Sequence, residues 1–205
     1  MKKMFFTYIT AWLIALPFTS YAQLHQNQEQ TMKSKKILVA FFSRTGENYA
    51  VGHIEKGNTH IVADIIADET KGELFRIEPV SPYPEHYSEC TEVAKQELND
   101  KCRPAILHDK TVEDYDIIFI GYPNWWGDMP MPVYTFIEKH IWQGKTVIPF
   151  CTHEGSGLSS TETKLKNVCK GATVLNGLAI RGTTAQQKQE QTKRIVKEWL
   201  SNLSL

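Results

Sequence analysis

The sequence contains no apolar run long enough to span a membrane, no excess of either charge and no closely spaced pair of cysteines. Its 205 residues include 23 Lys and Arg against 23 Asp and Glu, without a basic stripe, which argues against a nucleic-acid partner. The cysteines are Cys90, Cys102, Cys151 and Cys169, and no pair has the spacing of a metal site. With 41% hydrophobic residues, the chain is long enough for one domain with a proper core.

The first residues have the pattern of a secretory signal peptide. Lys2 and Lys3 precede an apolar run over 4–17, and small residues follow at Ser20 and Ala22. A retained membrane anchor is the alternative, but the run is shorter than the ~20 residues of a spanning helix. We therefore expect export to the periplasm, cleavage after Ala22 and no stable membrane insertion afterwards. The predicted organisation is a signal peptide over 1–22, a polar flexible leader over 23–34 and a domain over 35–205.

Export bears on the cysteines, because an even number in an exported protein permits disulfides without assigning them. Cys151 and Cys169 fall within apolar segments, which favours small buried side chains.

From residue 36 onward, apolar runs that predict strands alternate with segments of helical spacing. Strands are expected over 37–42, 74–78, 117–120, 146–150 and 172–180. Helices are expected near 61–72, 85–99, 130–137, 165–169 and 195–203. Pro149 conflicts with its strand because proline cannot donate to the sheet ladder. The alternation predicts an α/β three-layer sandwich with five parallel strands, whose ligands bind beyond the carboxyl ends of the strands.

The loop after the first strand contains hydroxyl groups and a glycine, at Ser43, Arg44, Thr45 and Gly46. Asn58 and Thr59 lie where the next helix should begin. Hydroxyls and backbone amides at a strand-to-helix turn can surround a phosphate, and the helix N-terminus favours negative charge. Taken singly, each hydroxyl is better explained as a cap or turn residue.

The loop after the third strand carries two tryptophans between a proline and a glycine, at Pro123, Asn124, Trp125, Trp126 and Gly127. A tryptophan at the carboxyl end of a strand offers a flat apolar wall to a planar ring. Packing beneath a neighbouring loop is the alternative for one of the two.

The loop after the fourth strand contains Thr152, His153, Glu154, Gly155 and Gly157. Its glycines let the backbone approach a ligand closely. His153 and Glu154 suit acid–base chemistry or, equally well, a solvated pair at a loop tip.

Together these loops resemble those of the flavodoxin family over residues 35–203. That family's first loop reads hydroxyl-x-Thr-Gly-Asn-Thr; here the motif is split by 11 residues, Glu47–Gly57. The resemblance implies strand order 2-1-3-4-5 and one FMN, whose phosphate is held by the first loop. It further implies that 123–127 line the isoalloxazine, with one tryptophan against it and Gly127 near N5, and that 152–157 contact the pyrimidine side.

The resemblance implies an electron carrier in which FMN cycles between oxidised, one-electron and two-electron forms, serving a redox partner protein or a small-molecule acceptor. No residue need be catalytic and no metal is expected. The first alternative is an FMN-dependent reductase that uses NAD(P)H and quinone, azo or nitro compounds. The second is a non-redox binding module on the same fold. Near-zero net charge weakens broad electrostatic docking of a partner, and export weakens the use of NAD(P)H.

Overall fold

The computed structural model describes residues 35–203, so the predicted signal peptide and leader lie outside the described residues. The strands are β1 (Ile37–Phe41), β2 (Gly46–Asn48), β3 (Gly52–Ile54), β4 (Glu73–Arg76), β5 (Ile117–Pro123), β6 (Thr146–His153), β7 (Thr173–Val174) and β8 (Leu178–Arg181). The α-helices are α2 (Asn58–Thr70), α3 (Tyr87–Asn99), α4 (Met131–Ile137), α5 (Thr161–Val168), α6 (Gly182–Gln187) and α7 (Gln189–Ser201), and η1 (Val112–Asp114) is a short 3₁₀ helix.

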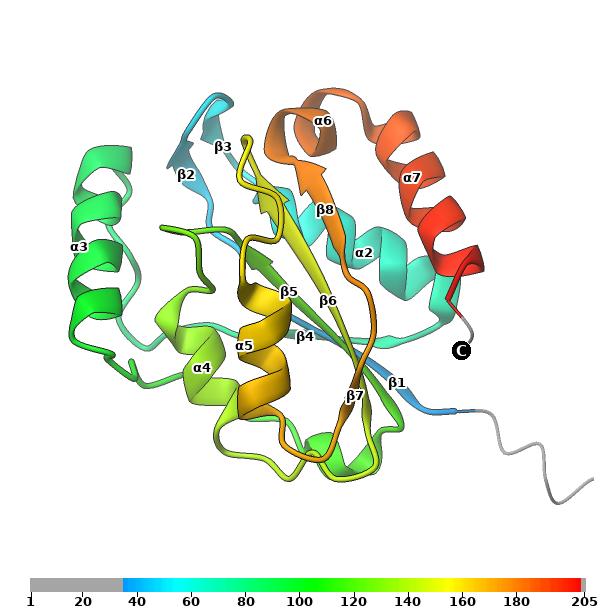
Figure 1. The fold of residues 1–205 in the computed structure, drawn as a ribbon. Coiled ribbons are helices and arrows are strands. Elements are labelled where there is room, and N and C mark those ends of the chain that lie inside the picture. Colours follow the sequence, from blue (N-terminus) through cyan, green and yellow to red (C-terminus); the bar gives the residue numbers. More distant parts are fainter. Residues whose placement is uncertain (1–34, 204–205) are drawn as a thin grey trace, which may run out of the picture. The chain divides into compact units, whose positions relative to one another are not determined.

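The central sheet is parallel throughout, and its order is β4-β1-β5-β6, with β7 and β8 both paired to β6 (Figure 1). Counting β7 and β8 as two pieces of one strand, this is the predicted order 2-1-3-4-5. The expected three-layer α/β architecture is confirmed. Every strand therefore ends at the same edge of the sheet, where the predicted binding loops begin.

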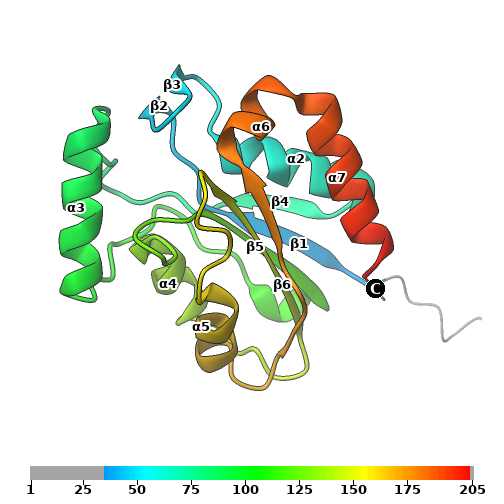
Figure 2. The ribbon, with the colours of Figure 1, turned by 45° about the horizontal axis from the view of Figure 1, so that its top comes forward.

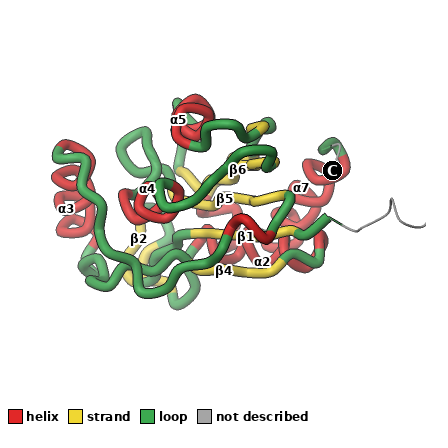
Figure 3. Tube along the Cα trace, turned by 90° about the horizontal axis from the view of Figure 1, so that it is seen from below, coloured by secondary structure: helices red, strands yellow, loops and turns green. Residues whose placement is uncertain are grey.

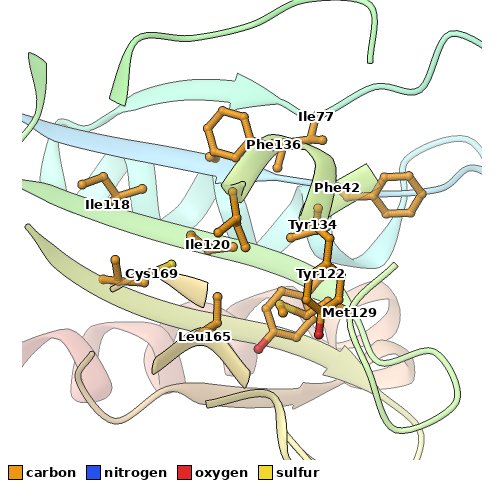
Figure 4. Close-up of a cluster of buried hydrophobic side chains, with 14 of the residues drawn as sticks. Phe42, Ile77, Ile118, Ile120, Tyr122, Met129, Tyr134, Phe136, Leu165 and Cys169 are labelled. Atoms are coloured by element: carbon orange, nitrogen blue, oxygen red, sulfur yellow. The ribbon is translucent and has the colours of Figure 1, made fainter. Parts of the chain in front are cut away.

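Both faces of the sheet are buried, which is why the strands read as continuous apolar runs. Along β1, Leu38 and Ala40 face one core, whereas Val39 and Phe41 face the other. Residues of α4 and α5 fill the first core (Figure 4), and residues of α2, α6 and α7 fill the second. Figure 3 shows α4 and α5 on one side of the strands and α2 and α7 on the other.

The fifth strand is broken where the sequence placed one strand over 172–180, and Pro149 explains the break. Leu175 N–H donates to Val147 O at 2.9 Å, so β6 turns its odd-numbered backbone groups towards the fifth strand. Pro149 faces the same way but has no N–H to donate. Gly177 lies against Pro149 at this break. A larger residue would not fit there, because a Cβ on Gly177 would lie 2.7 Å from Pro149 Cγ.

The 11-residue insertion, which the sequence assigned to a polar loop, forms an antiparallel hairpin of β2 and β3 (Figure 2). The hairpin is tied to the segment before α3, because Glu47 N–H donates to Glu85 O at 3.1 Å and Tyr87 N–H donates to the Glu47 carboxylate at 2.9 Å. The insertion thus extends the first loop towards α3.

All four cysteines are free thiols, and three of them are buried. Burial raises the pKa of Cys151 and of Cys169 to about 12, so both remain protonated and serve as small core residues. Over residues 35–203, no helix is both long and apolar enough to cross a bilayer.

Candidate flavin site

The three loops singled out in the sequence meet at the carboxyl edge of the sheet. Thr59 Oγ1 lies 2.8 Å from Thr152 Oγ1, which joins the start of α2 to the end of β6. Asn124 N–H donates to Thr152 O at 2.8 Å, and the Asn124 side-chain amide donates to Gly157 O at 2.8 Å. The three loops therefore lie side by side at this edge, where they can contribute to one site.

The first loop and the N-terminus of α2 form a cradle, which we define as Ser43 together with residues 57–60. His60 N–H donates to Ser43 Oγ at 3.1 Å. The amides of Asn58 and Thr59 have no hydrogen-bond partner among the described residues, and the first turn of α2 contains no acidic residue. Free amides at a helix N-terminus favour an anion.

Gly57 is what allows the cradle to close. A Cβ at this position would overlap both Ser43 Oγ and the carbonyl oxygen of Arg44. A residue with any side chain would therefore push the first loop away from α2. The insertion ends at this glycine, so the split motif is brought back together in space.

Asn58 points to a part of the site that the sequence analysis missed. Its Oδ1 is a buried side-chain oxygen without a hydrogen-bond partner in the described part of the chain, and its Nδ2 lies so close to Gly182 that a Cβ there would overlap it. Gly182 begins α6, directly after the fifth strand. The run Gly182-Thr183-Thr184 in the sequence could have predicted this part of the site, because the end of the fifth strand also belongs to the binding edge.

The Arg44 side chain points away from the cradle. Its guanidinium donates to the carbonyl oxygens of Glu47, Pro84 and Glu85, with Nη2 to Pro84 O at 2.6 Å. Arg44 thus fastens the hairpin and the start of α3 to the first loop. Thr45 is exposed beside it, and Gly46 opens β2.

The second loop makes a tight two-residue turn at Trp126 and Gly127. Trp125 and Asp128 exchange backbone hydrogen bonds of 2.9 and 3.0 Å, while Trp126 and Gly127 have φ values of 55° and 76°. Two positive φ values between paired residues are the geometry of a type I′ turn. Asn124 Oδ1 accepts Gly127 N–H at 3.1 Å and thereby fixes the turn.

The two tryptophans have different surroundings. The Trp125 ring packs edge-on against Phe42, with centroids 5.3 Å apart, and against Tyr83 at 5.0 Å. Because Phe42 precedes Ser43, Trp125 stands beside the first loop. Trp126 is 54% exposed, and its indole N–H donates to Thr91 O of α3 at 3.1 Å.

In the third loop, both candidate acid–base groups already have partners. Glu154 accepts Thr183 N–H at 2.6 Å and lies 3.6 Å from Arg181, so it caps the start of α6. His153 Nδ1 accepts Gly155 N–H at 2.8 Å. Burial lowers the pKa of His153 below its usual value and the nearby Arg181 adds to the effect, which favours the neutral ring.

Two cavities flank the first loop, and residues 152–157 line neither of them. One of about 500 Å³ lies towards β4 and is lined, among others, by Phe42, Ser43, Thr45, Arg76, Tyr83 and Leu107. The other, of about 190 Å³, lies towards α3.

The site's donor set fits FMN. The cradle offers a hydroxyl and two free amides to a phosphate. Asn58 Oδ1, a buried acceptor without a partner within residues 35–203, can accept a hydrogen bond from a hydroxyl group of the ligand. Trp125 supplies an aromatic wall beside the cradle. The candidate contacts for the phosphate and for the ring therefore lie on the same edge of one sheet.

Comparison with known proteins gives a family match and similar solved structures. The model of the Flavodoxin family matches residues 36–203. A solved structure assigned as a flavoprotein, from Bacteroides eggerthii, is 32% identical with a TM-score of 0.66, over 83% of this chain and 99% of that one. A similarly assigned protein from Bacteroides uniformis is 30% identical with a TM-score of 0.62, over 80% and 99%.

A more distant similarity supports the fold alone. A flavoprotein from Lactobacillus acidophilus, solved in complex with FMN, is 22% identical with a TM-score of 0.56, over 77% of this chain and 99% of that one. No protein of curated function gives a significant match. The family model covers nearly all of the described residues, and the chain belongs to the flavodoxin family.

Proposed function

We propose that this chain is an electron-transfer protein that binds one FMN at the carboxyl edge of its sheet. The cradle is the observation that carries the proposal, because it combines a glycine that no other residue can replace with free backbone amides and the Ser43 hydroxyl. The flavodoxin family uses FMN, and the Lactobacillus acidophilus relative was solved with it.

Each loop has its own part in holding the cofactor. Ser43 and the first amides of α2 bind the phosphate, and the half-buried Trp125 covers the ring system. Residues 152–157 approach the polar edge of the ring through backbone groups. The bound FMN supplies the ability to accept and release electrons one or two at a time.

The contacts of the third loop are consistent with electron transfer that needs no acid–base catalysis. Glu154 is engaged with the start of α6, and His153 uses Nδ1 to hold its own loop. Neither group is a free acid or base next to the ring. A carrier needs none, since its protein tunes the flavin through burial and hydrogen bonds.

A reductase is the second candidate, and the cavity of about 500 Å³ beside the first loop favours it. Its volume is within the ~300–1,000 Å³ range of small-molecule sites. Steady oxidation of NADH or NADPH in the presence of a quinone would establish the reductase. A single stoichiometric reduction without turnover would establish the carrier.

The cofactor itself is tested by loading the purified chain with excess FMN and removing the free flavin. We expect visible flavin absorption to stay with the protein and flavin fluorescence to be quenched by the adjacent tryptophan. A protein that emerges colourless would contradict FMN binding and favour a non-redox binding module.

We also propose that residues 1–22 direct export and are removed. The basic start, the short apolar run and the small residues before Gln23 support this proposal. N-terminal sequencing of the protein recovered from the periplasm should begin at Gln23. A chain that retains Met1 in the cytoplasm would contradict it.

A further inference from the structure

Three aromatic rings pack edge to face beside the first loop. The Tyr83 ring lies 5.0 Å from that of Trp125 and 5.7 Å from that of Phe42, with an interplanar angle of 85° in both pairs. Phe42 and Trp125 complete the triangle, with centroids 5.3 Å apart and an angle of 81°. Because edge-to-face contacts depend on orientation, a rotation of one ring disturbs both of its contacts.

Trp125 depends on this packing more than the other tryptophans of residues 35–203 do. The indole N–H groups of Trp126, Trp142 and Trp199 each donate to a backbone carbonyl oxygen, at 3.1, 2.8 and 3.3 Å. The indole N–H of Trp125 has no such partner in that part of the chain. The angle of the Trp125 ring is therefore set by packing against its two aromatic neighbours.

The two neighbours of Trp125 are held in different ways. Phe42 directly follows β1 and is 2% exposed, so the core fixes its ring. Tyr83 lies outside the helices and strands, between two prolines, and is only partly buried. Its hydroxyl donates to the carboxylate of Glu97 on α3, the one side-chain hydrogen bond that Tyr83 makes within residues 35–203. This bond is therefore what orients the Tyr83 ring.

The ionisation of the pair suits a phenol that donates and a carboxylate that accepts. Burial, together with the nearby Glu97 charge, raises the pKa of the Tyr83 phenol, so the phenol keeps the proton that it donates. Burial also raises the pKa of the Glu97 carboxyl, and the hydrogen bond from Tyr83 partly offsets the rise. The other titratable groups beside Tyr83 are the thiols of Cys90 and Cys102, and Arg44 lies beside Cys90. Glu97 thus loses its negative charge at a higher pH than an ordinary glutamate.

We propose that Glu97 is a positioning residue for the flavin wall: its carboxylate holds Tyr83, and Tyr83 holds the Trp125 ring at its angle. The inference rests on the proposed function, in which Trp125 covers the ring system of FMN. A charged acceptor forms a stronger hydrogen bond than a neutral one, so loss of the Glu97 charge loosens the Tyr83 ring. Flavin affinity should therefore fall in acid, although Glu97 acts only through Tyr83.

Riboflavin is the probe for this test, because it lacks the phosphate, whose own ionisation would add a second pH dependence. Fluorescence titration of the mature chain should show weaker riboflavin binding as pH falls through the raised pKa of Glu97. Glu97→Gln keeps an acceptor of the same shape without the charge. It should bind riboflavin about fivefold more weakly than the wild type at neutral pH and lose less affinity in acid.

A double-mutant cycle tests whether Glu97 acts through Tyr83. Tyr83→Phe keeps the ring without the hydroxyl and should weaken riboflavin binding by a similar factor. The double variant should bind about as weakly as Tyr83→Phe alone, because both changes act on the same hydrogen bond. Losses that simply add would mean that Glu97 does not act through Tyr83, and the proposal would be wrong.

The matched control is Glu92→Gln, the same substitution at an exposed position of the same helix. It should keep the affinity and the pH profile of the wild type. Urea unfolding separates positioning from a purely structural role. If Glu97→Gln lowers stability but keeps the wild-type affinity and pH profile, Glu97 only supports the fold and the proposal is overturned. A chain that binds FMN but not riboflavin would also overturn it, since the ring wall would then contribute no affinity of its own.

The flavin-free chain separates this inference from the proposed function. Contact between Tyr83 and Trp125 contributes to the near-ultraviolet circular dichroism, because the two rings lie 5.0 Å apart. We expect this spectrum to change in acid for the wild type, and to change less for Glu97→Gln and for Trp125→Phe. An unchanged wild-type spectrum would overturn the inference. A chain that shows the change but binds neither FMN nor riboflavin would defeat the proposed function and leave the positioning of Trp125 by Glu97 standing.

Discussion

At the first loop, Ser43 is 7% exposed and Thr59 1%, and a glycine closes the space between them; at the second loop, Trp126 is 54% exposed on a strained turn. The first loop is the buried end of the site, and it is built from small groups that are held in place by close packing. The second loop is the exposed end, where the large Trp126 ring is presented to solvent. The first arrangement suits a fixed, permanently held group, and the second suits a ligand or partner that comes and goes.

Gly57→Ala should have the largest effect on the buried first loop. Because the added Cβ would overlap Ser43 Oγ and the Arg44 carbonyl, the cradle must open, and we expect FMN affinity to fall about 100-fold or more. Equilibrium titration of FMN fluorescence would measure it.

The matched control is Gly144→Ala, in a turn with φ of 76° and open space around the added atom. It should lose about 1 kcal/mol of stability from backbone strain and keep its FMN affinity. If both variants bind FMN like the wild type, the cradle is not the phosphate site.

Ser43→Ala tests which part of FMN the buried end recognises. Losing one hydroxyl should weaken FMN about tenfold, the cost of one hydrogen bond to a charged group, and leave riboflavin affinity unchanged. An equal loss for both flavins would show that Ser43 supports the ring and not the phosphate.

The third loop allows a pH test. The pKa of His153 is lowered in the folded chain, so the unfolded chain takes up a proton first as pH falls. The stability from this group is fully present above the unfolded value of about 6.5 and is lost as pH falls through the lower folded value. Urea unfolding should show a smaller acid-induced loss for His153→Asn than for the wild type. Identical losses would exclude His153 as a contributor.

The smallest expected effect concerns the exposed end. Trp126→Asn places Asn-Gly, the pair that a type I′ turn prefers, at the centre of the turn. We expect this variant to stabilise the fold by about 0.5 kcal/mol, although the hydrogen bond from the indole to Thr91 O is lost. Thermal unfolding would measure the change. A clear loss of stability would mean that Trp126 is retained for packing, which would weaken the contrast between the two ends.

Much of this site followed from short segments of sequence. The apolar run over 37–42 and the hydroxyls after it predict a strand and a binding loop, because a buried strand and a strand end each have a local signature. The role of Arg44 had no such signature. Its partners Pro84 and Glu85 lie about 40 positions away, and only their backbone oxygens take part.

Local conflicts were also informative. Pro149 was incompatible with an unbroken ladder of hydrogen bonds to both neighbouring strands. In the structure β6 is continuous, and the neighbouring fifth strand is interrupted at Gly177. The sequence indicated that strand pairing must be interrupted near Pro149. It did not indicate which strand would be interrupted, because that depends on which neighbour the missing N–H faces.

The order of strands and helices, the two-sided burial of the sheet and the clustering of three loops at one edge were determined by the sequence itself, since each follows from local periodicity and from the geometry of parallel strands. The direction of Arg44, the capping role of Glu154, the hairpin in the insertion and the exposure of Trp126 were decided only by the tertiary structure. The physical reason is that a side chain's partners are set by packing between segments far apart in the chain, whereas its strand or helix is set by its neighbours.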